Sequence, residues 1–287
     1  MEYRKLTPDE ITQLEANFCR CADWSRVEVA DPFRPEHYRY ATFAGDIRLG
    51  TTENPHLREG GFEMPSGIYD ATISDCTVGA DVLINKIGNY IARYDIADGV
   101  LIENTACITM SGSSTFGNGV EVSVLNETGG REVTIYDCLS AHVAYIIAMY
   151  RHNTALIQSL RHLIDSYVES KRSDRGTIAK KVCIINSGNL TNIYVGPYAT
   201  ISGATSLSNG SLMSEKEDPV HVGPNVMAND FIICAGAKVD QGAVLVHTFV
   251  GQATSLTRLF SAHDSLFFAN CACENGESAA IFGGPYT

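Results

Sequence analysis

Residues 222–251 read VGPNVMANDFIICAGAKVDQGAVLVHTFVG, and small or aliphatic residues recur in this stretch at a spacing of six. An α-helix repeats about every 3.6 residues and a β-strand every 2 residues, so neither element alone explains the spacing. A short repeat of fixed length is typical of a solenoid, in which each unit stacks on its neighbours. In this stretch the spacing joins Val222, Ala228, Cys234, Asp240 and Val246.

The same spacing occurs in two earlier parts of the chain. It joins Val78, Ile84, Tyr90, Ile96, Ile102 and Ile108, and after a break Val195, Ile201 and Leu207. We interpret each unit as a short strand followed by a tight turn, with three units in one triangular coil. The aliphatic side chain would point inward and stack on the residue three units, or eighteen positions, later. Gly or Asn would relieve backbone strain at the corners.

This pattern resembles the hexapeptide-repeat superfamily, whose members fold as a left-handed parallel β-helix. The resemblance covers about residues 68–112 and 178–256, close to half of the chain. It implies a mainly β protein built around such a helix. The superfamily contains acyltransferases, sugar-nucleotide pyrophosphorylases with an attached domain of this kind, and zinc carbonic anhydrases.

Composition excludes some classes of function. The chain has 287 residues, a net charge of −12 and a pI of about 5.1. Without an excess of Lys and Arg, a general role on nucleic acid or a membrane surface is not expected. The start MEYRKLTPDE has no apolar signal core, and no run of eighteen apolar residues predicts a membrane span. The nine scattered cysteines then indicate reduced thiols and a cytoplasmic protein.

The repeats divide the chain into five segments. At the N-terminus, Thr7 can cap a helix that Pro8 starts, with acidic residues in the first turn. Short strand-like pieces follow this helix. We therefore expect an N-terminal cap with a helix and short strands at 1–66, a first β-helix block at 67–137, a long inserted α-helix at 138–177, a second β-helix block at 178–260, and an irregular C-terminal segment at 261–287 that is either a site or a truncated end.

The insert has a heptad pattern from Leu139 to Tyr167, with Asn153 as its one polar member. One reading places the apolar seam against the wall of the β-helix. The other makes it a self-association helix, in which a buried Asn sets the register. The insert is also the most basic part of the chain. Its charges are either a solvated surface or a contact for nucleotide or coenzyme A phosphates, and they come from Arg151, Arg161, Lys171, Arg172, Arg175, Lys180 and Lys181.

Two of the three superfamily activities are poorly matched by the sequence. A carbonic anhydrase of this fold needs three histidines around zinc, and His221, His247 and His263 lack the close pairing expected of that family. We therefore predict no metal ligands and keep a zinc hydratase as a minor alternative. A pyrophosphorylase needs a glycine-rich nucleotide loop, which the first sixty residues do not contain.

An acyltransferase needs a general base, most often His, that deprotonates a sugar hydroxyl or amine. His247 follows an expected inward aliphatic residue and should face out of the coil, so it is the favoured base, with His263 in reserve. We expect transfer of an acyl group, with acetyl-CoA as donor, to a sugar or sugar nucleotide. The acceptor would be held by Asn270, Glu274, Glu277 and Arg258.

A second reading has no catalysis at all. The chain would then be a sugar-nucleotide-binding or scaffold β-helix, related to the C-terminal domains of sugar-nucleotide pyrophosphorylases. Both readings favour a homo-oligomer. A trimer is the habit of the superfamily, and a heptad helix could equally make a dimer.

Several short motifs narrow the resemblance. The chain looks like the N-terminal part of an uncharacterised family of hexapeptide-repeat proteins, described as a domain of unknown function and common in gut Bacteroidetes. Family members continue past residue 287 with a His-rich segment, which implies that part of a site lies beyond this end. The motifs are the opening helix with Asp23-Trp24, Gly196-Pro197-Tyr198-Ala199, Leu207-Ser208-Asn209-Gly210, Ser265 to Asn270, and Glu274-Asn275-Gly276-Glu277.

Overall fold

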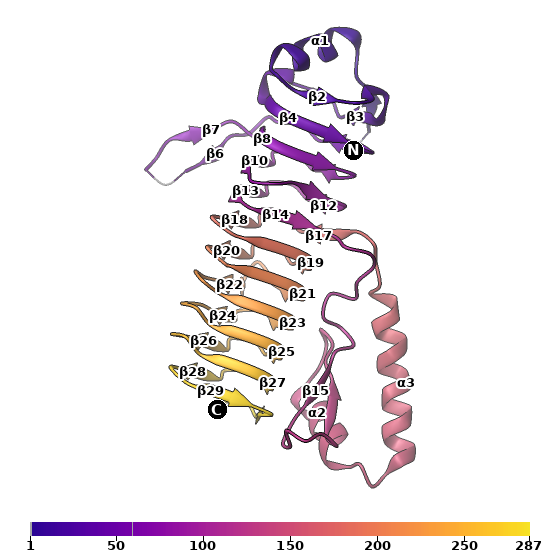
Figure 1. The fold of residues 1–287 in the computed structure, drawn as a ribbon, viewed down its shortest axis with the longest axis vertical. Helices are drawn as coiled ribbons and strands as arrows, with labels where there is room; N and C mark the ends of the chain where they lie inside the picture. The colour runs from indigo at the N-terminus through magenta and orange to yellow at the C-terminus, as the bar shows by residue number, and fades with distance from the viewer. Residues whose placement is uncertain (1, 59) are drawn as a thin grey trace.

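A computed structural model of the chain describes residues 2–58 and 60–287. The protein is mainly β, with one 26-stranded sheet in which nearly every pairing is parallel. Figure 1 shows the strands stacked as rungs along one axis, with the N-terminus at one end and residue 287 at the other. Within the described residues there are three α-helices, one in the N-terminal region and two in a segment that lies beside the stack.

Each turn of the chain contributes one strand to each of three walls, which we name A, B and C. In the C-terminal half a long strand bends at one corner, so that its first part belongs to wall B and its second part to wall C. Wall A holds β18 (Cys183–Ile185), β20 (Thr200–Ser202), β22 (His221–Val222), β24 (Lys238–Val239), β26 (Ser255–Thr257) and β28 (Ala272–Glu274). The bent strands are β19 (Asn189–Val195), β21 (Ser206–Met213), β23 (Met227–Cys234), β25 (Val244–Val250) and β27 (Ser261–Phe267), followed by β29 (Glu277–Ala279) on wall B and β30 (Phe282–Gly283) on wall C.

The same three walls extend through the N-terminal half. β4 (Tyr38–Ala44) and β8 (Gly67–Ser74) bend between walls A and B. The other strands of this half are β2 (Arg20–Cys21), β3 (Val27–Val29), β5 (Ile47–Leu49), β9 (Thr77–Val78), β10 (Leu83–Ile87), β11 (Ile91–Ala92), β12 (Tyr94–Ile96), β13 (Leu101–Thr105), β14 (Cys107–Thr109) and β17 (Gly176–Ile178). The N-terminal strands therefore belong to the main sheet, and residue 66 does not mark a structural boundary.

Inward aliphatic ladders hold the stack together. Ile84 pairs with Ile68 on one side and Ile102 on the other, and Ile184 continues the ladder to Ile201. All five are essentially inaccessible to solvent. Because neighbouring rungs place like side chains in contact, each coil buries its apolar face only against the coils next to it.

The length of a rung differs from the expected eighteen residues. Ile84 to Ile102 is a step of eighteen, but Val222 pairs with Val239, and Val239 pairs with Leu256, at steps of seventeen. Three units of six make eighteen residues, so in residues 222–251 positions counted in steps of six no longer coincide with the positions that point inward. Leu245 points into the core, whereas Val246 lies on the outside of wall B. Asp240 lies at a corner, where Lys238 Nζ is 3.2 Å from its carboxylate.

Two other expectations about segments need correction. The C-terminal segment from residue 261 is not irregular, because β27 pairs residue for residue with β25 and the rungs continue to β30. Its polar outer side chains hide the repeat in the sequence. The insert begins near residue 111 rather than 138, and it contains a hairpin of β15 (Glu121–Ser123) and β16 (Glu132–Thr134) before its helices.

The N-terminal region agrees with its local sequence signals. Helix α1 (Pro8–Ala16) starts at the capping box expected from Thr7: the Glu10 amide donates to Thr7 Oγ1, and the Thr7 amide donates to the Glu10 carboxylate. A 3₁₀ turn (Trp24–Arg26) follows the Asp23 cap, and a second one (Pro35–His37) precedes β4. The short strand β1 (Arg4–Lys5) runs antiparallel to β3, and the small hairpin of β6 (His56–Leu57) and β7 (Glu63–Met64) projects from the stack in Figure 1.

The insert forms two helices, α2 (Ala141–Met149) and α3 (Thr154–Ser170), instead of one continuous helix. Asn153, expected as a polar member of a continuous seam, is the N-cap of α3, and its side chain accepts from the Leu156 amide. The first helix has already ended at Met149, and the Asn153 cap starts a new helix by accepting a hydrogen bond from one of its free backbone amides.

The apolar side of the insert packs on the outside of wall C. A second hydrophobic cluster joins Leu139, Ile147 and Ile164 of the insert to Phe249 and Leu266 of the wall. The seam is thus used within the chain, as the first reading of the heptad pattern proposed. None of the described helices is both long enough and apolar enough to span a bilayer.

Candidate functional site

A polar ladder runs along the corner between walls B and C. Asp230, His247 and Asp264 occupy the same corner position on three consecutive rungs, seventeen residues apart. Each has a positive φ, between 46° and 54°, which turns the strand from one wall to the next. Side chains at stacked corner positions face the same way, so the ladder brings their polar ends together (Figure 1 shows the rungs β23, β25 and β27).

His247 lies between two carboxylates. Its Nδ1 is 3.2 Å from Asp264 Oδ1, and its Nε2 is 3.6 Å from Asp230 Oδ2. The first distance is a hydrogen bond, and the second leaves Nε2 near a carboxylate without a direct bond. His247 keeps 37% of its side chain exposed, so its ring is accessible to a substrate.

His263 joins the same cluster from wall B. Its Nδ1 is 2.9 Å from Asp264 Oδ2, and its ring centroid is 5.8 Å from that of His247. Asp264 therefore contacts both imidazoles, one through each carboxylate oxygen. The spacing of the histidines in the sequence predicted no close pairing between them. His247 and His263 are nevertheless neighbours, because His263 is paired with Val246 on the adjacent rung.

The insert borders this corner at both ends. It leaves the stack between β14 on wall B and β17 on wall C, which is the B/C corner itself. At the upper end Ser114 Oγ donates to Asn209 Oδ1 at 2.9 Å, and the amide of Asn209 donates to Asp230. At the lower end the Leu125 amide donates to the Ala280 carbonyl. The histidines thus lie on an open corner with the insert hairpin as its neighbour.

The side chains of this cluster could bind a metal ion, and a histidine among them could act as a general base. One ligand atom from each of His247, His263 and Asp264 lies within 4.8 Å of the others. Two imidazoles and a carboxylate suit Zn²⁺ or a similar transition metal, and three protein ligands would leave a position open for water or substrate.

The four residues expected to hold the acceptor are spread over the stack. Arg258 Nη1 pairs with Glu274 Oε2 at 2.8 Å beside wall A, away from the B/C corner. Asn270 sits in the turn that leads from β27 to β28, where its amide donates to the Gln252 carbonyl. Glu277 lies on β29 and pairs with Ser261 on wall B, the wall that also carries His263. The structure therefore brings Glu277 nearest in register to the histidines.

Asp230 is the residue that sequence reasoning missed. A signal was present, since 230, 247 and 264 are spaced by one rung of seventeen residues. A count in units of six does not align them. Three of the basic residues expected to meet phosphates are already in ion pairs: Arg151, Lys171 and Arg175 pair with Glu132, Asp137 and Asp95, respectively.

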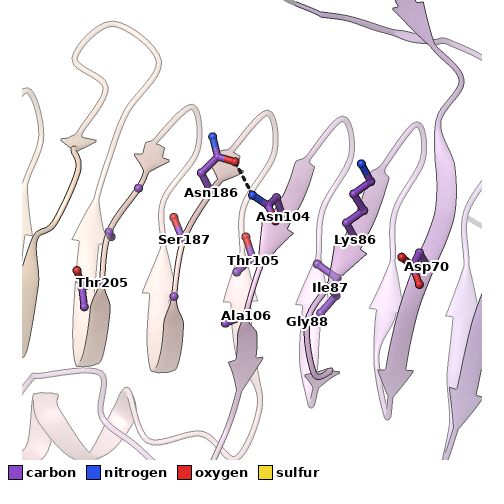
Figure 2. Close-up of a pocket in the computed structure, with 13 residues that line it drawn as sticks. Asp70, Lys86, Ile87, Gly88, Asn104, Thr105, Ala106, Asn186, Ser187 and Thr205 are labelled. Carbon is purple, nitrogen blue, oxygen red and sulfur yellow. Dashed lines mark hydrogen bonds between the residues drawn. The ribbon is translucent and has the colours of Figure 1, made fainter.

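A separate groove follows the corner between walls A and B in the N-terminal half. It has a volume of ≈ 840 Å³ and lies along Asp70, Lys86, Asn104 and Asn186. Figure 2 shows these side chains on successive rungs, with Asn104 Nδ2 donating to Asn186 Oδ1 at 2.8 Å. Neither this groove nor the apolar pocket of ≈ 580 Å³ around Tyr145 and Phe282 includes His247 or His263.

Comparison with known proteins gives a family without an assigned activity. The model of the family described as "Domain of unknown function (DUF4954)" matches residues 3–287. The chain is also similar to an uncharacterized protein of Treponema pallidum (strain Nichols), with 28% identity over 248 residues. That match covers 83% of this chain and 34% of the relative, so the chain spans about a third of the length of the relative.

Proposed function

We propose, on the premise that the chain belongs to the DUF4954 family, that it transfers an acyl group from a thioester of the acetyl-CoA type to a sugar or sugar nucleotide. The observation that carries this proposal is the hydrogen bond of His247 Nδ1 to Asp264 Oδ1 at 3.2 Å. A carboxylate on Nδ1 holds the imidazole with a proton on that nitrogen and leaves Nε2 as the base. We also propose that the three-walled stack is a left-handed β-helix of the hexapeptide-repeat superfamily, in a cytoplasmic protein.

The proposed reaction uses one base and two carboxylates. His247 Nε2 takes the proton from the acceptor hydroxyl or amine as its oxygen or nitrogen attacks the thioester carbonyl. The tetrahedral intermediate collapses, the carbon–sulfur bond breaks, and the imidazolium returns the proton to the leaving thiolate. Asp230 lies 3.6 Å from Nε2. Its carboxylate can therefore accept a hydrogen bond from another hydroxyl of the bound sugar. Asp264 stabilises the transient positive charge on the ring.

The test is a transfer assay that follows free thiol release from acetyl-CoA with a panel of sugars and sugar nucleotides. His247→Gln should lower turnover by roughly 10²–10⁴-fold, the usual contribution of a general base. His221→Gln is the matched control, because His221 also lies near a carboxylate, 3.8 Å from Asp240, but on wall A. Equal activity of wild type and His247→Gln would reject His247 as the base.

Thermal unfolding in the presence of acetyl-CoA, coenzyme A and sugar nucleotides identifies the donor separately. A ligand at a hundred times its Kd stabilises the native state by about 2.7 kcal/mol. A shift with coenzyme A compounds supports transfer. A shift with sugar nucleotides alone favours the non-catalytic binding reading.

The spacing of the ligand atoms favours one second candidate, a zinc-dependent hydration or hydrolysis at the same cluster. A bound Zn²⁺ would lower the pKa of its water and supply a hydroxide nucleophile. Metal analysis of protein purified with and without added Zn²⁺ separates the two functions. One tightly held zinc per chain, lost in both His247→Gln and His263→Gln, would replace the acyltransferase proposal.

A further inference from the structure

The A/B corner of the N-terminal half carries a second ladder, which neither proposed reaction uses. Five of its members occupy the corner position of consecutive rungs, as the flanking strand registers show, and the sixth, Phe18, follows the end of α1 in register with the first rung. They are Phe18, Tyr40, Asp70, Lys86, Asn104 and Asn186, and all six have a positive φ between 48° and 61°. We name this set the corner ladder.

The first two members form a stacked aromatic pair. The rings of Phe18 and Tyr40 are stacked, with centroids 5.1 Å apart and an interplanar angle of 4°. Both remain exposed, at 63% and 61% of their accessible surface. Stacking between two rings explains part of their position, but not why two large apolar side chains stay open to solvent on a corner.

The other four members are polar and border the groove of ≈ 840 Å³. They offer a carboxylate, an ammonium group and two amides, so both donors and acceptors of hydrogen bonds face outward. Figure 2 shows Lys86 and Asn186 reaching beyond the rungs on the same side. The floor of the groove is lined by the small residues Gly88, Ala106 and Gly188, which permit close approach of a ligand to the backbone.

The architecture excludes one common occupant of such a surface. A peptide adds to a sheet by pairing with free backbone groups at a strand edge. Along this corner the backbone bonds run between rungs, as in Asn186 N to Glu103 O and Gly88 N to Thr105 O. Along this corner the described rungs therefore offer no strand edge, and the net charge of −12 disfavours an anionic nucleic acid.

We propose that the corner ladder and its groove bind an extended oligosaccharide. The ring face of Tyr40 that Phe18 does not cover suits the apolar face of a pyranose ring, and amides and charged groups suit hydroxyls that donate and accept. Rungs are spaced by about 4.8 Å, so the ladder is about 24 Å long, and one rung corresponds closely to one hexose unit of an extended chain. This proposal is independent of acyl transfer at His247, although a bound glycan would be a fitting acceptor.

The test is affinity electrophoresis of the intact chain in native gels that contain dextran, mannan, xylan, mixed-linkage β-glucan or polygalacturonate. Wild type should be retarded by at least one of these polysaccharides. Tyr40→Ala should weaken that binding roughly tenfold, as should Asn104→Ala combined with Asn186→Ala. Tyr286→Ala removes an aromatic side chain that is 82% exposed but lies outside the ladder, and should bind as wild type does.

The proposal is overturned if no gel retards the wild type, or if Tyr40→Ala and wild type migrate alike in the retarding gel. Equal loss in Tyr40→Ala and Tyr286→Ala would also overturn it, because binding would then not depend on the ladder. Thermal unfolding of each variant shows that it is folded. The thiol-release assay with small sugars distinguishes this result from failure of the transferase proposal, since Tyr40→Ala should leave that assay unchanged.

Discussion

At the scale of single residues, the corners decide where polar side chains meet. A positive φ is uncommon outside glycine, and Asn, Asp and His tolerate it better than most residues. Here it recurs at every rung, for example at Asn209, Asp230 and His247, so it reflects the architecture of the corner more than strain at one site. The consequence is that residues seventeen apart in sequence become neighbours. His247 and Asp264 are the pair for which this matters most.

The Arg4–Glu10 pair makes the N-terminal region sensitive to acid. Arg4 donates two hydrogen bonds to the Glu10 carboxylate, at 2.7 and 2.9 Å, and lowers the pKa of Glu10 from 4.5 to about 2. A depressed carboxyl pKa contributes stability above the ordinary value, and this is lost as pH falls from about 4.5 to about 2. Glu10→Gln keeps the capping box but removes the charge.

We therefore expect wild type to unfold at a higher temperature than Glu10→Gln near neutral pH, with the difference shrinking between pH 4.5 and 2. Thermal unfolding followed by circular dichroism across this range measures the difference. A Tm difference that stays constant down to pH 2 would show that the ion pair does not contribute to folding stability.

At the scale of elements, the insert is a layer attached to one wall. Its hairpin and two helices bury their apolar side against wall C, where Phe249 is 1% exposed and its ring centroid lies 5.5 Å from that of Phe268. The bent strands thus have two apolar sides in this region, one toward the interior of the stack and one toward the insert. This explains why Ile232 and Cys234, which do not belong to the inner core, are buried.

Replacing Phe249 by Ala should cost about 3–5 kcal/mol and loosen the insert. We expect faster tryptic cleavage within the insert at Arg151 and Arg161, measured by mass spectrometry under native conditions. Phe260→Ala is the matched control, since Phe260 belongs to the inner core and does not contact the second cluster. If both variants expose the insert equally, the insert is not held by wall C in particular.

At the scale of the whole molecule, the stack is a one-dimensional assembly whose rungs contact mainly their neighbours. Tyr94 joins two rungs that the insert separates in sequence: its hydroxyl donates to the Ile193 carbonyl at 3.1 Å, across the point where the insert leaves. Stability of such an array approximates a sum over rungs and the interfaces between them. The insert lies beside several rungs of the C-terminal half (Figure 1). Its position therefore depends on the stability of all these rungs together.

Removing one complete rung should therefore be tolerated better than removing a rung minus one residue. Deletion of 84–101 brings Ile102 to the place of Ile84, its pairing partner, whereas deletion of 84–100 brings Leu101 there and reverses the inward and outward sides. We expect the first variant to unfold cooperatively with lower stability, and the second to aggregate. Urea unfolding and size-exclusion chromatography make the comparison. Similar behaviour of both deletions would mean that register is not set by the inward ladder.

Much of the fold can be predicted from the sequence. The aliphatic repeat predicted a mainly β protein built from stacked short units, and the Thr7-Pro8 signal predicted α1, because inward packing and capping depend on residues only a few positions apart. The motifs that pointed to a family of unknown function are confirmed by a match over nearly the whole chain. The outward placement of His247 was also predicted, although the inward neighbour is Leu245 and not Val246.

Only the tertiary structure decided which polar residues meet. The contacts of Asp230, His247 and Asp264 depend on a rung of seventeen residues, and one residue of error per rung changes every partner along a corner. The path of the insert, its break at Asn153 and the ladder from Phe18 to Asn186 follow from packing between distant segments. Polar corners carry no hydrophobic period, so the sequence determined the interior of this protein, and the three-dimensional stack determined its surface sites.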